Sequence, residues 1–297
     1  MLTPAAIVTG ATGGIGYAAA EGLARAGRRV VLTGRNAEKG RAALDRLRRA
    51  VPAAEAEFRL LDVSSLDAVA AFTSGWSGPV GILINNAGIM ALPRRRVSVD
   101  GFELQLATNY LGHFALTLRL LPALLATPGA RVVSVSSLAH RAGQIAFDDL
   151  QGERAYSPYR TYGQTKLAML MFARELQRVA TLRGWSLQSL AAHPGWSATD
   201  IVTNGMGGGL TAGVAHIGFR LLAQSAADGA KPILFAALDP AAEPGGYYGP
   251  ARLSETRGPV APSRVMPQAR DAQAAARLWT VSEQLTGVAA EDTVAKM

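Results

Sequence analysis

Two residues four positions apart, Tyr162 and Lys166, have side chains that could move a proton. An apolar run of helical length follows them, so we expect both on one face of a helix with their polar ends close together. A nearby ammonium group stabilises a phenolate, so Lys166 would lower the pKa of Tyr162 and suit it to acid–base chemistry. A surface tyrosine beside a solvated lysine can have the same spacing, so the rest of the chain must distinguish the two cases.

A further polar group comes from a predicted strand. The β-branched run 131–136 follows a Pro-Gly pair and predicts a buried strand that ends in the hydroxyl groups of Ser136 and Ser137. Other strands are predicted at 5–9, 29–33, 58–61, 80–84 and 186–192, with a last one near 247–248, and helical patterns lie between them. This alternation predicts an α/β fold with a single Rossmann-type, doubly wound parallel sheet of about seven strands and helices on both faces.

The predicted topology brings distant residues together. Right-handed crossovers place the carboxyl ends of parallel strands on one edge of the sheet, where ligands bind in such folds. The residues that follow predicted strands are Gly10, Asp62, Asn86, Ser137 and Pro194. We expect one dinucleotide-binding and catalytic domain over 1–297, with a substrate lid at about 196–220 and a C-terminal extension at about 240–297 that contains a helix at 270–285.

A glycine-rich turn follows the first predicted strand. Gly10, Gly14 and Gly16 lie between this strand and an Ala-rich helical pattern. A turn without side chains lets the backbone approach a pyrophosphate at a helix N-terminus, where free N–H groups and the helix dipole favour an anion. The turn therefore predicts a dinucleotide site.

Composition narrows the class of protein. Of the 297 residues, 49% are hydrophobic and 18% are charged, which is typical of a folded chain. The net charge of +8 could suit nucleic acid, but the arginines are dispersed and the run Arg94-Arg95-Arg96 contains no aromatic residue, so we expect no nucleic acid partner.

Two further observations concern metals and location. The chain has no cysteine, which excludes disulfides and thiolate zinc sites, and its four histidines have no metal-ligand spacing, so no metal is expected. No leader pattern is evident at the N-terminus, and charged residues interrupt the apolar segment 213–238, so we expect neither a signal peptide nor a membrane span. These patterns favour a cytoplasmic protein.

Taken together, these motifs resemble the short-chain dehydrogenase/reductase family over about residues 5–200. The motifs are Thr9-Gly-x-x-x-Gly-x-Gly16, Asn85-Asn86-Ala87-Gly88, Asn109, Ser137, Tyr162-x-x-x-Lys166 and Pro194-Gly195. Within the family the chain is most similar to the retinol-dehydrogenase-like branch, through 136–140 (Ser-Ser-Leu-Ala-His), 147–150 (Phe-Asp-Asp-Leu), 166–168 (Lys-Leu-Ala) and 193–195 (His-Pro-Gly).

The resemblance implies a role for each matched residue. Tyr162 would exchange a proton with the substrate oxygen, Ser137 would hydrogen-bond that oxygen, and Lys166 would tune the tyrosine and hold the nicotinamide ribose. Asn109 would position a water molecule in a proton relay through Lys166. The remaining cofactor contacts would come from Gly10, Thr12, Gly13, Gly14, Ile15, Gly16, Asp62, Val63, Asn86, Ala87, Gly88, Pro194, Gly195 and Thr199.

The second predicted strand indicates which cofactor is used. Folds specific for NAD usually carry an acidic residue at this strand's end, where it binds the adenosine ribose. Here the strand ends Gly34-Arg35-Asn36. Arg35 can pair with a 2′-phosphate and Asn36 adds a donor, which predicts NADP. A solvated turn arginine is the alternative interpretation.

The function predicted is an NADP(H)-dependent alcohol dehydrogenase or carbonyl reductase. Apolar residues in 138–160 and 196–218, among them Ile145, Phe147 and Trp196, favour a bulky hydrophobic or aromatic ketone or aldehyde as substrate. The alternatives are a non-enzymatic NADP-binding regulator and an epimerase or dehydratase on the same fold. The resemblance also implies a homodimer through helices at 102–125 and 162–182, although Met169, Phe172 and Leu176 could equally face the chain's own core.

Overall fold

A single mixed sheet forms the centre of the molecule. The computed structural model describes residues 3–196 and 224–294. Within these residues the sheet has eight strands in the order β3-β2-β1-β4-β5-β6-β7-β8. They are β1 (Ala5–Val8), β2 (Arg29–Gly34), β3 (Ala56–Leu60), β4 (Val80–Asn85), β5 (Ala130–Val135), β6 (Leu187–Ala192), β7 (Tyr247–Arg252) and β8 (Arg257–Pro262). Neighbouring strands run parallel except for β8, which is antiparallel to β7.

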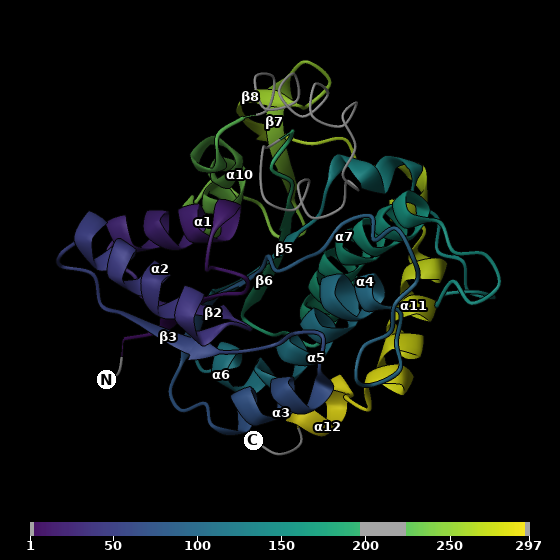
Figure 1. The fold of residues 1–297 in the computed structure, drawn as a ribbon, viewed down its shortest axis with the longest axis horizontal. Helices are drawn as coiled ribbons and strands as arrows, with labels where there is room; N and C mark the ends of the chain where they lie inside the picture. Colours follow the sequence, from purple (N-terminus) through teal and green to yellow (C-terminus); the bar gives the residue numbers. More distant parts are fainter. Residues whose placement is uncertain (1–2, 197–223, 295–297) are drawn as a thin grey trace.

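Helices cover both faces of this sheet (Figure 1). One face carries α1 (Gly14–Arg25), α2 (Ala37–Ala50) and α10 (Ala226–Leu238). The other face carries α3 (Leu66–Ser74), α5 (Gly112–Arg119), α6 (Leu121–Leu125), α7 (Pro158–Leu182), α11 (Ala272–Thr286) and α12 (Ala290–Val294). The doubly wound α/β fold is therefore confirmed, with one antiparallel strand that sequence analysis did not predict.

The long helix predicted at 102–125 is wrong in detail, because the segment is divided into four pieces. These are α4 (Leu104–Leu106), a π-helical turn η1 (Ala107–Leu111), α5 and α6. At the π-helical turn the Asn109 carbonyl accepts a hydrogen bond from His113 Nδ1 at 3.2 Å. Pro122 in the first turn of α6 has no N–H group to donate to the preceding turn, so the helix restarts there. Such π-turns often occur at functional sites.

The C-terminal extension consists of the β7–β8 hairpin, a 3₁₀ turn η3 (Pro267–Arg270), α11 and α12. Helix α11 packs along α5 and α7. Its Trp279 ring lies 5.2 Å from Phe114 and 5.9 Å from Phe172, centroid to centroid, and its Ser282 hydroxyl lies 2.7 Å from the Tyr110 hydroxyl. These contacts make the aromatic face of α5 and α7 part of the chain's own core.

The expected dimer surface is therefore covered. Met169, Phe172 and Leu176 are each at most 2% exposed, and α11 lies on this side of α7. A homodimer remains a prediction, but one that used these three side chains would first have to displace α11.

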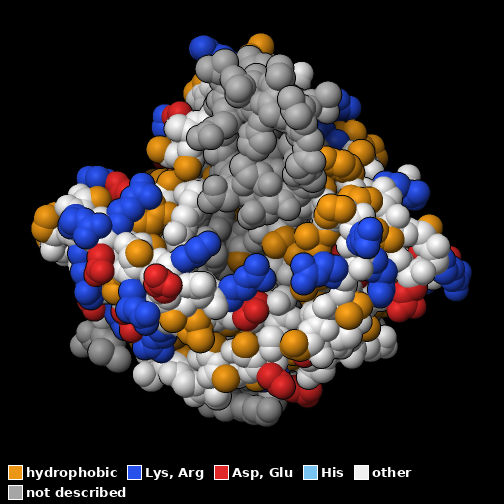
Figure 2. All heavy atoms as spheres, viewed as in Figure 1, with side chains coloured by type: hydrophobic (Ala, Val, Ile, Leu, Met, Phe, Trp, Pro, Cys, Tyr) orange, Lys and Arg blue, Asp and Glu red, His pale blue; other side chains and the backbone are white. Residues whose placement is uncertain are grey.

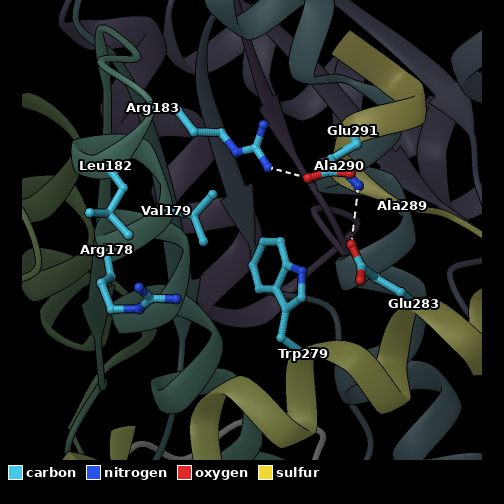
Figure 3. Close-up of a pocket in the computed structure, with 9 residues that line it drawn as sticks. All are labelled: Arg178, Val179, Leu182, Arg183, Trp279, Glu283, Ala289, Ala290 and Glu291. Carbon is cyan, nitrogen blue, oxygen red and sulfur yellow. Dashed lines mark hydrogen bonds and ion pairs between the residues drawn. The ribbon is translucent and has the colours of Figure 1, made fainter. Parts of the chain in front are cut away.

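A small cavity of about 320 Å³ lies at the C-terminal end of α7, where this helix meets α11 and α12 (Figure 3). Arg183 of α7 pairs with Glu291 of α12, and Glu283 of α11 accepts a hydrogen bond from the Ala290 N–H. Exposed ion pairs contribute little to stability. The aromatic contacts are therefore expected to hold α11 in place.

Replacing Trp279 by alanine should lower the free energy of unfolding by about 3 kcal/mol, because the cavity it leaves lies against Phe114 and Phe172. Urea unfolding followed by far-UV circular dichroism measures the change. The control is Leu182→Ala on α7, whose side chain is exposed and should change stability by less than about 0.5 kcal/mol. Equal stabilities of the two variants would show that α11 is not anchored by its tryptophan.

Candidate active site

A large cavity lies at the carboxyl ends of the parallel strands. Its volume is about 1120 Å³. Residues that follow five different strands line it: Gly10 after β1, Asp62 after β3, Asn86 after β4, Ser137 after β5 and Pro194 after β6. The strand order changes direction between β1 and β4, which is where ligands bind in doubly wound sheets. The residues predicted to meet at this edge do so.

The glycine turn is shaped for close approach of a ligand to the backbone. Gly10 has a φ of +65°, and a Cβ on Gly16 would lie 2.4 Å from the Gly10 carbonyl oxygen. Gly13 precedes α1, offers no side-chain cap, and has open space where a Cβ would be. The first turn of α1 also contains no acidic residue. Its free N–H groups therefore suit a pyrophosphate, and the residues present fit a dinucleotide cofactor.

Thr9 joins this turn to the neighbouring strand. Its hydroxyl oxygen accepts hydrogen bonds from the N–H groups of Asn86 and Ala87, at 2.8 and 2.9 Å. It also lies 2.9 Å from His113 Nε2. Burial lowers the pKa of His113 to about 4, so the imidazole is neutral. Since its Nδ1 donates to the Asn109 carbonyl, Nε2 must accept from Thr9. These contacts give His113 a structural role.

Ser137, Tyr162 and Lys166 line the same cavity. Tyr162 and Lys166 lie on α7 and are 8% and 5% exposed. Lys166 Nζ donates to the Val135 carbonyl at 3.0 Å and lies 5.8 Å from the centre of the Tyr162 ring. Ser137 directly precedes the 3₁₀ helix η2 (Leu138–Ala142) and caps it, its Oγ accepting from the Ala139 N–H at 3.2 Å. Tyr162 and Lys166 therefore lie on one face of α7, as predicted.

The electrostatics of these groups differ from the expectation that Lys166 would lower the pKa of Tyr162. Burial raises the pKa of Tyr162 to about 12, and its hydrogen bond with Ser137 offsets only part of this effect. Burial also lowers the pKa of Lys166 to about 8. Desolvation is the largest effect on both groups, because both side chains are buried.

Asn109 lies behind the cavity rather than in its wall. Its side chain accepts from the Ile89 N–H at 2.8 Å and donates to the Ile89 carbonyl and to Thr165 Oγ1, both at 2.9 Å. It therefore fastens the segment after β4 to α7. The backbone carbonyl oxygen of Asn109 already accepts a hydrogen bond from His113. The water relay expected of Asn109 stays a prediction.

The two residues expected at the adenosine ribose have different surroundings. Arg35 is exposed and lines the cavity beside Gly34. Asn36 instead caps α2, with its Oδ1 accepting from the Lys39 N–H at 2.9 Å, and is not in the cavity wall. Basic side chains also form a band across the face seen in Figure 2.

Most of the predicted cofactor residues line the cavity together. These are Gly10, Thr12, Gly13, Gly14, Ile15, Gly16, Arg35, Asp62, Val63, Asn86, Ala87, Gly88, Tyr162, Lys166, Pro194 and Gly195. Asn36 and Asn109 lie outside the wall, as described above. Thr199 and the predicted lid, apart from Trp196, lie outside the described residues. Trp196, one of the apolar residues expected at the substrate, is in the wall.

Sequence analysis missed one apolar wall, formed by Ile89, Met90, Ala91 and Leu92. A buried polar chain holds it: the Ala91 N–H donates to Gln105 at 2.7 Å, Gln105 donates to the Tyr156 hydroxyl at 3.0 Å, and Tyr156 donates to the Leu92 carbonyl at 2.8 Å. The run of apolar residues directly after the Asn-Asn-Ala-Gly motif could have indicated this wall. Ile145 and Phe147, which were expected in the pocket, pack against the core.

The fold and this cavity together define a dinucleotide-binding α/β protein. A model of the family described as short chain dehydrogenase matches residues 4–206. The chain is 39% identical over 296 residues to polyprenol dehydrogenase of Mus musculus, covering 97% of this chain and 85% of the relative. It is 36% identical over 290 residues to retinol dehydrogenase 12 of Homo sapiens, covering 95% and 86%.

A solved structure supports the same assignment. The crystal structure of an uncharacterised protein from Mycobacterium paratuberculosis superposes with a TM-score of 0.80, at 40% identity and 96% coverage of both chains. The protein therefore belongs to the short-chain dehydrogenase/reductase family, whose members are oxidoreductases, and this membership supports a nicotinamide cofactor. Among the helices in the described part of the chain, none is long and apolar enough to cross a membrane.

Proposed function

We propose that this protein is an NADP(H)-dependent oxidoreductase that interconverts a bulky hydrophobic or aromatic ketone or aldehyde with its alcohol. The observation that carries the proposal is one continuous cavity wall that contains both the glycine turn and the group Ser137, Tyr162 and Lys166. A reacting carbon and a proton source must be held together for such chemistry, and this wall offers both sites.

The bound nicotinamide would supply or accept the hydride. The chain's own residues would handle the proton and the geometry. Tyr162 would donate its hydroxyl proton to the carbonyl oxygen during reduction, and Ser137 would hydrogen-bond the same oxygen. Lys166, which lines the cavity next to Gly88, would hold ribose hydroxyl groups. With its raised pKa, Tyr162 is protonated at neutral pH, which is the form that can donate a proton.

The proposed substrate class follows from the apolar part of the wall. Met90, Leu92, Leu138 and Trp196 border the cavity with Tyr162, and apolar pockets of this kind bind apolar groups. The relatives are named for retinol and polyprenol, which are both long apolar alcohols. A hydrophobic carbonyl compound is consistent with both observations.

Turnover decides between an enzyme and a non-enzymatic regulator. Purified protein should oxidise NADPH in the presence of members of a panel of aromatic ketones, long aliphatic aldehydes and polyene aldehydes, with small polar aldehydes reacting poorly. Binding of NADPH without turnover of any panel member would favour the regulator, and consumption of a nucleotide sugar without net NADPH oxidation would favour an epimerase.

Arg35 is the proposed reader of the 2′-phosphate. Arg35→Ala should lower the preference for NADPH over NADH by roughly tenfold or more, because a charged hydrogen bond of this kind is worth about 1.5–3 kcal/mol. The measurement is kcat/KM with each cofactor in wild type and variant. Arg25→Ala, which removes an exposed arginine paired with Glu21, is the control and should leave the ratio unchanged. Wild type that prefers NADH, or an unchanged ratio in Arg35→Ala, would refute this role.

A further inference from the structure

The turn between β7 and β8 has an unusual backbone. Leu253, Ser254 and Glu255 are consecutive non-glycine residues with φ values of 50°, 56° and 68°. Residues other than glycine rarely adopt this left-handed backbone region. Runs of such residues persist only where surrounding contacts enforce them. Contacts from other parts of the chain must therefore hold this turn.

Glu255 is the centre of those contacts. Its Oε2 accepts from Arg141 at 2.9 Å and lies 3.1 Å from His193 Nε2, and its Oε1 accepts from the Arg264 N–H at 3.1 Å. Arg141 also donates to the Ser254 carbonyl at 3.2 Å. Burial would raise the pKa of Glu255, but these partners outweigh it and hold the pKa at about 2, so the group is a carboxylate.

His193 transmits this arrangement to the end of β6. The Gly195 N–H donates to His193 Nδ1 at 3.2 Å, so Nδ1 carries no proton. The proton of the neutral ring must then be on Nε2, which faces Glu255 and lies 2.9 Å from Ser263 Oγ. The ring is fully buried, and a Cβ on Gly249 would lie 1.9 Å from it. The carboxylate thus fixes one tautomer of a ring that has no room to turn.

The turn also touches the cavity directly. Thr256 and Gly195 both line it. The Thr256 carbonyl accepts from the Trp196 N–H at 2.9 Å and from Gln224 Nε2 at 2.6 Å. Gly195 has a φ of +68°, and a Cβ there would lie 2.4 Å from that same carbonyl oxygen. The hairpin therefore holds the backbone at Trp196 and leaves no room for a side chain at Gly195.

We propose that Glu255, His193 and Arg141 are positioning residues that fix the Pro194–Gly195 turn at the part of the cavity where the nicotinamide half of the cofactor would lie. The inference rests on the proposed function. Arg141 lies four residues after Ser137, so the same carboxylate joins the segment that bears the proposed catalytic serine to the Pro194–Gly195 turn. The adenosine half would lie at Arg35 and the glycine turn, away from this network.

The affinities for two ligands distinguish a positioning role at the nicotinamide end from a general effect on protein stability. NADP⁺ spans the whole site, whereas 2′-phospho-ADP-ribose lacks only the nicotinamide. In His193→Leu the Gly195 N–H loses its acceptor, so the Kd for NADP⁺ measured by calorimetry should rise by about tenfold, while the Kd for 2′-phospho-ADP-ribose should change by less than about twofold. In His193→Asn the side-chain oxygen can take the place of Nδ1, so NADP⁺ affinity should largely be restored.

Glu255→Gln provides a second test, which preserves side-chain size at a partly buried residue. It should weaken NADP⁺ binding in the same ligand-selective way, and Glu291→Gln, which breaks the exposed pair with Arg183, should not. Equal losses for both ligands, or no loss in either the His193→Leu or the Glu255→Gln variant, would overturn the positioning role. Wild type that binds neither ligand would refute the proposed function itself, and with it this inference.

Discussion

Replacing Tyr162 by phenylalanine is expected to reduce kcat by at least ~10²-fold, since a positioned general acid typically contributes that much or more. The substitution keeps the ring, which is 8% exposed and packed in the cavity wall, and removes only the hydroxyl group that would give its proton to the substrate. Because that hydroxyl is not proposed to hold the adenosine half, the Kd for NADPH should change little. Steady-state kinetics and fluorescence titration measure the two quantities.

The pH dependence should differ between the two directions of the reaction. Reduction needs Tyr162 protonated, and with its pKa near 12 it stays protonated throughout the neutral range. Oxidation needs the deprotonated form, so its rate should rise with pH across that range. The control for Tyr162→Phe is Tyr17→Phe, which removes a hydroxyl group on α1 outside the cavity wall. Near-normal turnover in Tyr162→Phe would show that another group supplies the proton.

Replacing Lys166 by methionine should abolish turnover and yet stabilise the cofactor-free protein. Burial lowers the pKa of Lys166 from 10.5 to about 8, which corresponds to about 3 kcal/mol of unfavourable free energy for the charged side chain below pH 8. Methionine has similar length and no charge. The hydrogen bond lost to the Val135 carbonyl costs about 1 kcal/mol. The free energy of unfolding at pH 7 should therefore rise by about 2 kcal/mol.

The same shift predicts how stability varies with pH. Between about pH 8 and 10.5 the unfolded chain keeps a proton on Lys166 that the folded chain has released, so the stability of the wild type should rise with pH across this window. Urea unfolding at several pH values should show this rise in wild type and in the control Lys231→Met, whose lysine is exposed, but not in Lys166→Met. A rise of equal size in all three proteins would mean that Lys166 is not the group responsible.

The parts of the site that sequence reasoning predicted are those determined by short-range patterns. The glycine turn needs only a strand, three glycines and a helix in succession, and the pairing of Tyr162 with Lys166 needs only helical spacing. The meeting of Gly10, Asn86 and Ser137 followed from the alternation of strands and helices, because parallel topology leaves one edge for their ends.

The parts that were missed depend on contacts between distant segments. Asn36 is an exception, because its role as the cap of α2 follows from its position one residue before the helix; its predicted cofactor contact stays a prediction. In 102–125, the π-helical turn precedes a close approach of Gly112 to the Val63 carbonyl, a contact between distant segments that the sequence does not show. Three left-handed residues without a glycine, at 253–255, give no local signal for the β7–β8 turn.

The electrostatic prediction for Tyr162 failed for a related reason. Spacing showed that Lys166 would be near, but the pKa depends on how deeply both groups are buried, and burial depends on the whole core.

The packing of α11 has a consequence for the order in which the chain emerges from the ribosome. Helices α5 and α7 are synthesised well before Trp279, so their aromatic face has no cover until α11 has left the exit tunnel. Exposed apolar surface of this kind promotes association between nascent chains. We expect slow translation between α7 and α11 to increase aggregation in the cell, and chaperones that bind apolar segments to be needed most during that interval.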